Sequence, residues 1–481
     1  MISRNFIKNS IIYTLAGILP MASAVVLLPL YIENLSTEAY GALVVYTTFT
    51  LLIQIVVTFS FDSSVYIHYH ELKGDSKKLS AFVGTAFLFM IIAGVAAAVI
   101  LAFAGDMIFS LALSDKNVSF FPYGLASVGS GVFQAIFKVN SSLLQTREKP
   151  ETYFWSNVFS FSVIAILIVI GLHFFPHSLA GPIFGRLAGS FIPCVWVLWR
   201  IAKEYGFHAD FSWLRSSFSF NLYQFIYQLQ QWVINQFDKI LMLFYLTLAD
   251  VGVYDFALKC LLPVELLMNS LHNAFYPKVV SALMGKPDQS TAGEINTYYH
   301  GLTSVVTLLV TGSILVVPLL IVAFVNKPGY QLAIQYIPYV GVIYFFRTMR
   351  LYFAIPYNTL KYTKPLPVVY IIVVIIKISL MLLTMSRWGI YGVISASIAS
   401  AISEVYLLKF FIRDRFRYKF SAIKIVIAPT LLAGLIVIIE PLSRHAYGWI
   451  YHAFYVIISL LLLLWIYRNE IVKVVPLKLF R

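Results

Sequence analysis

Apolar runs of about twenty residues recur along most of this chain, and they constrain its fold more than any other feature of the sequence. A helix of that length crosses the roughly 30 Å of hydrocarbon in a bilayer. The composition agrees, because 60% of the 481 residues are apolar and only 12% are charged. Soluble domains have about 45–50% apolar and about 25% charged residues. We therefore predict an all-α polytopic membrane protein.

The apolar runs predict about fourteen transmembrane helices. Their expected ranges are 11–31, 41–61, 81–104, 118–145, 153–172, 179–200, 218–245, 251–278, 298–324, 333–357, 366–383, 389–411, 422–439 and 449–467. Pro122 and Pro193 are among the prolines that interrupt these runs. Broken helices are tolerated in membranes only where neighbouring protein or a water-filled cavity satisfies the freed backbone groups.

Positively charged residues predict the orientation of the chain. With the N-terminus inside, 24 of the 35 Lys and Arg residues fall in predicted cytoplasmic segments and four fall in outside segments. Because Lys and Arg accumulate in cytoplasmic loops, we expect both termini to be cytoplasmic. Residues 1–10 are polar and no small-residue cleavage site follows the first apolar run, so no signal peptide is expected.

Short matches at a constant spacing predict an internal duplication. Gly41 and Gly252 are 211 residues apart, and so are Gly181 and Gly392. The expected organisation is an N-terminal six-helix lobe at 1–210, a C-terminal six-helix lobe at 211–420 and two appended helices at 421–481. Because six is even, both lobes would have the same orientation in the membrane. A substrate site is then expected between them.

Basic residues within the predicted spans are the candidate ligands of an anion. A charge within a span is costly and usually faces an interior or a cavity, and Arg and Lys are suited to binding phosphate. The six candidates for a cationic cavity are Lys138, Arg186, Lys239, Lys259, Arg347 and Arg350. Arg347 and Arg350 are three apart and share a helix face, whereas Lys377 could instead snorkel.

Acidic residues within the spans are the candidate proton or cation sites, and they are Asp238, Asp255, Glu265 and Glu404. Asp255 and Lys259 are four residues apart, so their mutual neutralisation is an equally open interpretation. Asp238 and Lys239 are adjacent and are not expected to share a helix face. Each would then pair with another helix.

Amide side chains form a stripe in the seventh predicted span. Their three- and four-residue spacing places them on one helix face, and the members are Asn221, Gln224, Gln228, Gln231 and Asn235. Such a face is too polar for lipid, so we expect it to line a cavity and to bind sugar hydroxyls.

The stretch 237–259 reads as two membrane helices joined by an exposed turn at 246–254. Its sequences FDKIL at 237–241 and ADVGVY at 249–254, together with AFYP at 274–277 and REKP at 147–150, carry a family resemblance. The chain resembles the multidrug/oligosaccharidyl-lipid/polysaccharide (MOP) exporter superfamily. More narrowly, it is similar to the Wzx-type flippases of O-antigen and capsule repeat units.

The resemblance implies a MATE-like carrier in the bacterial cytoplasmic membrane, with two six-helix lobes around a cavity that opens alternately to each side. Its substrate would be an undecaprenyl-pyrophosphate-linked oligosaccharide, moved from the cytoplasmic to the outer leaflet. The implied partners are membrane lipid, a proton or sodium ion, and polysaccharide polymerase and chain-length proteins, with no nucleic acid.

Other functions stay open at this point. A multidrug or cation antiporter of the same superfamily should show more acidic than basic residues in its spans. A lipid II flippase or a sporulation-type relative is separated poorly by sequence. A membrane-embedded glycan polymerase or ligase should bring a large loop or an acidic catalytic motif. We expect no enzyme, no catalytic residue and no cofactor. We also expect no metal, because neither His68 with His70 nor His173 with His177 has further ligands at suitable spacing.

Overall fold

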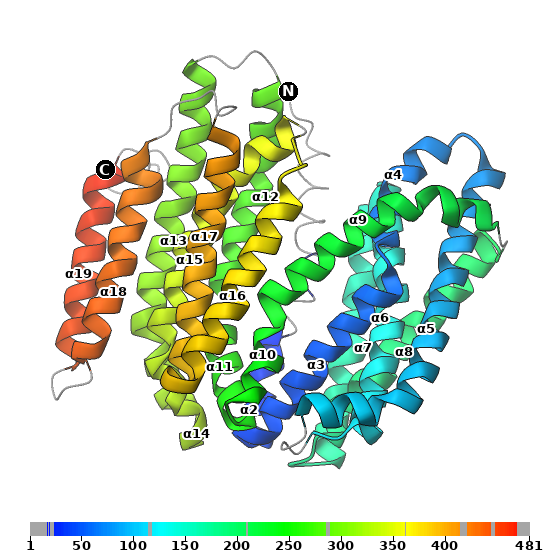
Figure 1. Cartoon of the computed structure of the whole chain (residues 1–481), viewed down its shortest axis with the longest axis horizontal. Helices are drawn as coiled ribbons and strands as arrows, with labels where there is room; N and C mark the ends of the chain where they lie inside the picture. Colours follow the sequence, from blue (N-terminus) through cyan, green and yellow to red (C-terminus); the bar gives the residue numbers. More distant parts are fainter. Residues whose placement is uncertain are drawn as a thin grey trace. The chain divides into compact units, whose positions relative to one another are not determined.

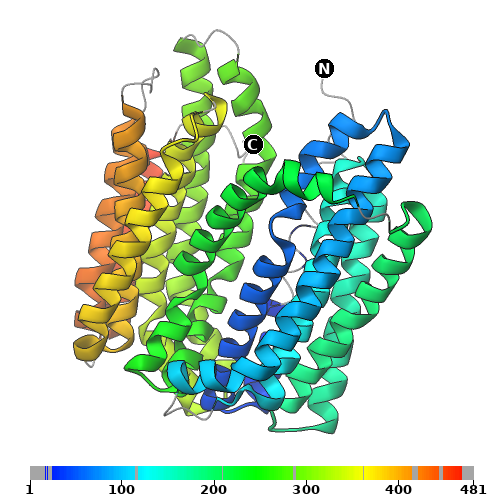
Figure 2. The same cartoon turned by 45° about the vertical axis from the view of Figure 1, so that its right-hand side comes forward.

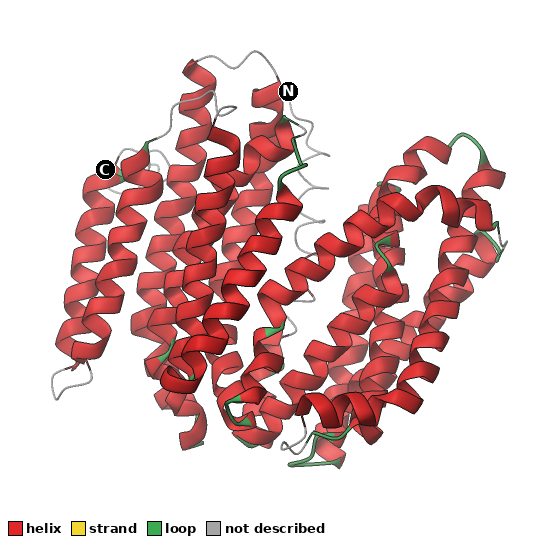
Figure 3. Cartoon of the chain, in the orientation of Figure 1, coloured by secondary structure: helices red, strands yellow, loops and turns green. Residues whose placement is uncertain are grey.

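The computed structural model describes residues 17, 19, 24–113, 118–207, 210–284, 289–360, 362–413, 421–443 and 448–468. Helices are the only regular secondary structure within these ranges (Figure 3), which confirms the predicted all-helical chain. Residues 1–16 and 469–481 lie outside the described ranges, so the predicted orientation of the two termini stays a prediction.

Nine helical segments of the described chain are long and apolar enough to cross a membrane. They are Thr37–Leu72, Ser76–Leu111, Phe120–Thr146, Pro150–Phe174, Ala180–Glu204, Gly293–Phe324, Leu366–Trp388, Ile390–Ile412 and Ile423–Pro441. The chain is therefore a multi-pass membrane protein, as predicted. Helices also cover most of the other predicted spans, but they are shorter or more polar, so the count of fourteen stays a prediction.

Residues 1–255 form one of two compact units, called unit 1. Its helices are α2 (Leu28–Asn34), α3 (Thr37–Thr58), α4 (Phe61–Leu72), α5 (Ser76–Leu113), the π-helical turn η1 (Phe120–Gly124), α6 (Leu125–Thr146), α7 (Pro150–Phe174), α8 (Ala180–Glu204), α9 (Phe211–Gln236), α10 (Asp238–Leu241), the 3₁₀ turn η2 (Met242–Phe244) and the first part of α11 (Leu248–Cys260). Helix α6 is the centre of the unit, because it packs against α3, α4, α5, α7 and α8 (Figures 1 and 2).

Residues 256–481 form the second compact unit, unit 2. Its helices are α12 (Leu262–Met284), α13 (Gln289–Phe324), α14 (Pro328–Gln331), η3 (Leu332–Gln335), α15 (Ile337–Thr359), α16 (Leu366–Trp388), α17 (Ile390–Ile412), η5 (Ile423–Ile427), α18 (Ala428–Ser443) and α19 (Gly448–Ile466). Helix α15 holds the central place here and packs against α12, α13, α17 and α18. Helices α18 and α19 lie side by side in Figure 1, and α19 also packs against α13.

The helix starts repeat with a nearly constant spacing along the chain. Helices α3, α5, α6 and α8 begin at 37, 76, 125 and 180, and α11, α13, α15 and α17 begin at 248, 289, 337 and 390. The spacing stays close to the 211 residues that separate the matched glycines. The repeat thus extends from short motifs to whole helices, although the predicted lobe boundary at 210 stays a prediction.

The two copies of the repeated motif pack directly on each other within unit 1. A Cβ atom on Gly41 of α3 would lie 1.8 Å from the carbonyl oxygen of Leu248. A Cβ atom on Gly252 of α11 would lie 2.3 Å from the carbonyl oxygen of Thr37. Each glycine is four residues beyond the residue that its counterpart meets, so the contact is reciprocal. Only a residue without a side chain allows the two backbones to approach this closely.

The predicted exposed turn at 246–254 is wrong in its extent. Helix α11 already begins at Leu248, so the stretch without helix is confined to residues 245–247. The side chain of Thr247 accepts from the backbone N–H of Asp250, and Asp250 Oδ2 accepts from the backbone N–H of Thr247. This reciprocal capping satisfies N–H groups at the helix start. Gly252 and Val251 are buried rather than exposed.

Candidate functional site

Three polar side chains from three helices meet inside unit 1. Lys138 of α6 lies 3.0 Å from Asp62 of α4, measured from Nζ to Oδ2. The same ammonium donates to Gln228 Oε1 of α9 at 3.1 Å, and Gln228 Nε2 donates to Asp62 Oδ1 at 3.2 Å. The amide therefore bridges the two charges, and we call Asp62, Lys138 and Gln228 the bridged triad.

A break in the first long helical segment places Asp62 in this triad. Helix α3 ends at Thr58, and Phe59 and Ser60 have φ angles of 40° and 57° before α4 begins at Phe61. Non-glycine residues in this left-handed region cost free energy, on the order of 1–3 kcal/mol each. Because the break starts a new helix at Phe61, Asp62 lies in the first turn of α4, where the positive end of the helix dipole favours a carboxylate.

A cavity of about 330 Å³ opens beside the bridged triad. Its lining combines hydroxyl, amide, carboxylate and aromatic groups, and the residues are Asp62, Ser63, Tyr66, Ile67, Ser142, Phe220 and Gln224. The volume falls in the range of about 300–1,000 Å³ that is usual for small-molecule sites. This hollow offers both hydrogen-bonding groups and ring faces between apolar helices.

The predicted amide stripe of α9 is divided among different surroundings. Gln224 lines the cavity and Gln228 belongs to the triad. Asn221 is buried, with 1% of its surface exposed. The amide of Asn235 donates to the backbone carbonyl of Gln231 on its own helix at 2.8 Å. The structure thus brings one of the five amides to the lining of the cavity, and the binding of sugar by the stripe stays a prediction.

Asp238 and Lys239 pair with each other, which corrects the expectation that they would not meet. Lys239 Nζ lies 3.4 Å from Asp238 Oδ1, and the two side chains are only 5% and 3% exposed. Tyr254 donates its hydroxyl to Asp238 Oδ2 at 3.0 Å, and Lys239 Nζ also donates to Gln236 Oε1 at 3.1 Å. The pairing is possible because α9 ends at Gln236 and α10 is a single turn, so the two residues do not follow one regular helix.

The remaining candidates of the first repeat and of α11 are Asp255, Lys259 and Arg186. Tyr40 of α3 donates its hydroxyl to Asp255 Oδ2 at 2.9 Å. Lys259 is half-buried in α11. Arg186 of α8 lies next to Tyr31, and its Nε atom is buried without a hydrogen-bond partner among the described residues.

Two ion pairs on neighbouring turns of α15 form the polar centre of unit 2. Arg347 Nη1 lies 2.8 Å from Glu265 Oε2 of α12. Arg350 Nη1 lies 3.6 Å from Glu404 Oε1 of α17. Tyr344 adds a hydrogen bond to Glu265 at 3.4 Å, and the Arg347 guanidinium carbon lies 5.4 Å from the centre of the Tyr344 ring. The predicted anion ligands Arg347 and Arg350 are therefore paired with predicted ion sites, Glu265 and Glu404.

The cations of these ion pairs differ in how far they are exposed. The side chains of Lys138, Arg347 and Arg350 are 34%, 26% and 30% exposed, whereas that of Lys239 is 5% exposed. The Asp238–Lys239 pair is the most buried of these pairs, which suits it to holding α10 in place.

Several polar contacts were missed because the sequence gives no sign of which helices adjoin. Gln54 of α3 donates to the backbone carbonyl of Gln134 at 3.3 Å, and Gln134 donates to Ser190 of α8 at 3.1 Å. At the ends of α6 and α8, Arg147 pairs with Glu204. Burial raises the pKa of the adjacent Tyr205, just beyond α8, to about 12. For the bridged triad, the available signal in the sequence was Asp62, a carboxylate at the end of an apolar run.

Comparison with known proteins supplies the family. Residues 6–283 match the model of the family described as polysaccharide biosynthesis protein. The chain belongs to this family. It is also 24% identical to protein 1 of the Lsg locus of Haemophilus influenzae over 290 residues, which cover 58% of this chain and 67% of that protein. The membership confirms the resemblance to polysaccharide exporters that the sequence motifs carried.

Solved structures supply the fold. The lipid II flippase MurJ, in an inward closed conformation, has a TM-score of 0.67 at 18% identity and covers 97% of this chain and 100% of its own. An inward-facing multidrug resistance MATE family transporter of the MOP superfamily has a TM-score of 0.62 at 11% identity, over 83% of this chain and 95% of its own. The family member described here therefore has the MATE-like fold that was predicted.

Proposed function

We propose that this protein flips an undecaprenyl-pyrophosphate-linked oligosaccharide repeat unit from the cytoplasmic to the outer leaflet of the bacterial inner membrane. Membership of the polysaccharide biosynthesis family supports a glycan as the substrate, and the MurJ- and MATE-like fold supports transport as the activity. The observation that carries the proposal is the polar cavity beside the bridged triad.

The physical need for such a cavity follows from the substrate. An oligosaccharide diphosphate that crosses hydrocarbon unaided loses its hydrogen bonds to water, at several kcal/mol for each unsatisfied group. The hydroxyls of Ser63 and Ser142, the amide of Gln224 and the rings of Tyr66 and Phe220 offer replacements for that hydration. Aromatic faces suit the apolar faces of sugar rings, and the polar groups suit their hydroxyls.

The finer architecture is part of the proposal. Fourteen spans would be arranged as two parallel six-helix lobes, 1–210 and 211–420, with 421–481 as two appended helices and both termini cytoplasmic. The recurrence of helix starts at a spacing close to 211 residues supports the duplication. Alternating access of the kind that repeat-built transporters use would then move the head group.

Ion-pair exchange links the substrate to a gradient in this proposal. An incoming diphosphate would compete with Glu265 and Glu404 for Arg347 and Arg350. A carboxylate that loses its arginine would then take up a proton or a sodium ion. Binding of the anion and binding of the cation are thereby coupled through the same two pairs.

Flipping of a labelled undecaprenyl-pyrophosphate-linked oligosaccharide in proteoliposomes tests the function. Arg347→Ala and Arg350→Ala should each reduce the flipping rate about tenfold or more, because a hydrogen bond to a charged group contributes about 1.5–3 kcal/mol. Arg387→Ala, in the exposed last turn of α16, is the matched control and should flip at the wild-type rate.

Two outcomes would contradict the proposal. If both α15 variants flipped the substrate at the wild-type rate, at equal incorporation of folded protein, the arginines would not be substrate ligands. Absence of flipping by the wild-type protein, together with export of a cationic dye, would favour the multidrug function of its MATE-fold neighbours instead.

A further inference from the structure

Two positively charged side chains lie over tryptophan rings at the end of α8. The Arg200 guanidinium carbon lies 5.5 Å from the centre of the Trp196 ring, and Lys203 Nζ lies 5.3 Å from the centre of the Trp199 ring. Trp199 is 61% exposed, and Lys203 is exposed as well. Because the face of an indole attracts a cation, the end of α8 presents two cations that are each held over a ring.

Aromatic rings of α7 extend this surface. The Phe159 ring contacts the Trp196 ring edge-on at a centroid distance of 6.1 Å. Trp155, one turn earlier in α7, is 65% exposed. The two helices pack antiparallel, since Gly171 of α7 meets Gly181 of α8 at the other end of the pair. Aromatic rings from both helices and the two cations of α8 therefore gather at the same end.

Carboxylates do not neutralise these two cations. Among the described residues, neither Arg200 nor Lys203 forms an ion pair with a carboxylate, because the neighbouring Glu204 pairs with Arg147. Arg200 Nη2 donates instead to the uncharged Asn140 Oδ1 at 2.6 Å, and its Nε is buried without a hydrogen-bond partner in the part of the chain that the structure describes. Asn140 thus positions the guanidinium and leaves its charge uncompensated.

The surface next to these rings is apolar. Toward the middle of α8, Phe191, Ile192 and Val195 are 50%, 43% and 46% exposed, and Ile166 of α7 is 56% exposed. An exposed apolar face of a membrane-spanning helix contacts acyl chains, whereas Trp residues are typical of the head-group level. A ligand that fits the whole surface therefore has an anionic head and an apolar tail.

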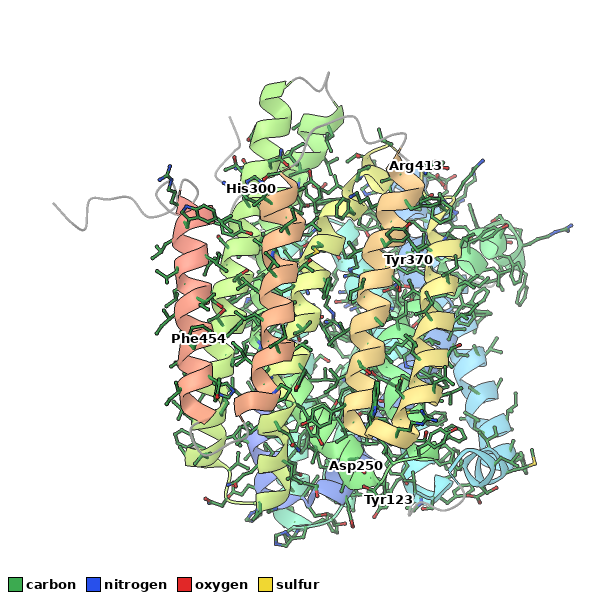
Figure 4. The ribbon with its side chains drawn as sticks, turned by 60° about the vertical axis from the view of Figure 1, so that its left-hand side comes forward. Tyr123, Asp250, His300, Tyr370, Arg413 and Phe454 are labelled. Carbon is green, nitrogen blue, oxygen red and sulfur yellow. The ribbon has the colours of Figure 1, made fainter. Side chains whose placement is uncertain are left out.

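A similar arrangement recurs in the second copy of the repeat. Phe410 of α17 is 211 residues after Trp199. The Arg413 guanidinium carbon lies 4.9 Å from the centre of the Phe410 ring, at the end of α17 (Figure 4). Phe410 is 44% exposed, and Tyr406, one turn earlier, is 66% exposed. The equivalent helices α8 and α17 thus both carry a cation over an exposed ring at the same position of the repeat.

We propose that this end of the α7–α8 pair binds the head group of an anionic phospholipid. Arg200 and Lys203 contact the phosphate, since basic side chains attract anionic lipid at a membrane surface. Trp155 and Trp199 lie against the glycerol region, and the apolar face of α8 takes the acyl chains. On the predicted orientation of the chain, the lipid belongs to the cytoplasmic leaflet. The inference does not rest on the proposed function.

Native mass spectrometry of the full-length protein in detergent tests this site, with phosphatidylglycerol as the anionic probe and phosphatidylcholine as the zwitterionic one. The wild type should bind phosphatidylglycerol more tightly. Lys203→Gln and Arg200→Gln should each raise the Kd for phosphatidylglycerol about fivefold and leave that for phosphatidylcholine unchanged. Trp199→Leu keeps both cations and should also weaken phosphatidylglycerol binding, because the ring that holds Lys203 is lost.

Lys78→Gln is the matched control, since it removes the same charge from an exposed residue on the same predicted side of the membrane, where Lys78 pairs with Asp75. It should bind phosphatidylglycerol as the wild type does. If Arg200→Gln fails to fold, Lys203→Gln still decides, because Lys203 is exposed. Equal weakening by Lys78→Gln and Lys203→Gln would overturn the proposal and leave only a general attraction. Competition by inorganic phosphate as strong as that by the lipid would also overturn it.

Discussion

The polar groups of unit 1 and unit 2 lie partly on corresponding helices of the repeat but are built from different chemistry. Gln54 lies seventeen residues after the first residue of α3, and Glu265, in α12, lies seventeen residues after the first residue of α11. In unit 1 the Gln54 amide donates to the backbone carbonyl of Gln134. In unit 2, Glu265, from α12, forms an ion pair with Arg347. Equivalent positions of the repeat have thus become neutral in one copy and charged in the other.

The central helices show the same divergence. Lys138 and Arg350 each lie thirteen residues after the start of α6 and α15. Lys138 shares its carboxylate with the Gln228 amide, whereas each arginine of α15 has a carboxylate of its own. Unit 1 therefore combines a cavity with a bridged, partly neutral network, and unit 2 concentrates paired charges. Under the proposed function, this difference would place sugar binding in unit 1 and ion exchange in unit 2.

The largest expected effect concerns the contact between the two motif copies. Gly41→Ala and Gly252→Ala each place a methyl group within 2.3 Å of a backbone oxygen, so the two helices must separate. We expect each to lower the free energy of unfolding by about 3 kcal/mol or more, the scale of overpacking, measured by thermal unfolding in detergent. Gly312→Ala on α13 meets no atom within 4 Å and should be neutral or stabilising by up to about 1 kcal/mol.

Removing one cation from each unit should destabilise the two polar networks by different amounts. Arg347→Ala leaves Glu265 with the Tyr344 hydroxyl, whereas Lys138→Ala leaves Asp62 with the Gln228 amide that already bridges it. Losing a partner of a fully buried pair costs about 3–5 kcal/mol, and about a quarter of each unit 2 side chain is exposed. We therefore expect a loss of about 1–3 kcal/mol for Arg347→Ala and a smaller loss for Lys138→Ala. Equal losses in unfolding experiments would remove the distinction between the units.

Exchanging the residue types between the two copies of the repeat tests their difference directly. Glu265→Gln gives unit 2 the amide of unit 1, and a double-mutant cycle with Arg347→Gln should return a coupling energy of about 0.5–3 kcal/mol. The single variant should still bind the glycan lipid but lose its response to an imposed proton gradient. The reciprocal change, Gln54→Glu, directs a carboxylate at the Gln134 carbonyl and should destabilise unit 1. A gradient response that survives Glu265→Gln would exclude Glu265 from coupling.

The smallest expected effect concerns the amide bridge of the triad. Gln228→Leu removes two hydrogen bonds, one to each charge, but leaves the Asp62–Lys138 pair in contact. A loss of about 1–2 kcal/mol in unfolding free energy is expected, together with weaker glycan binding. Asn235→Leu, which removes the hydrogen bond to the Gln231 carbonyl of the same helix, should change glycan binding little. Equal effects on binding would mean that the bridge has no special role.

Local sequence patterns were sufficient to predict most of the helices, the repeat and the family of this protein. Hydropathy over windows of about twenty residues located the helices, because the length that spans hydrocarbon is a property of the segment itself. The spacing of Gly41 and Gly252 predicted a repeat that now extends to helix starts. The motif at 237–254 indicated the family before any comparison. The exposed turn predicted at 246–254 was wrong because the capping of α11 by Thr247 and Asp250 starts the helix earlier.

The membrane class, the helical content and the family followed from the sequence, because all three depend on residues that are close together in the chain. The partners of the buried charges were decided only by the tertiary structure. Asp62 meets Lys138, and Glu265 meets Arg347, across separations of more than seventy residues. Such a pair forms only when the packing of whole helices brings two side chains within about 4 Å, and no local pattern encodes that packing.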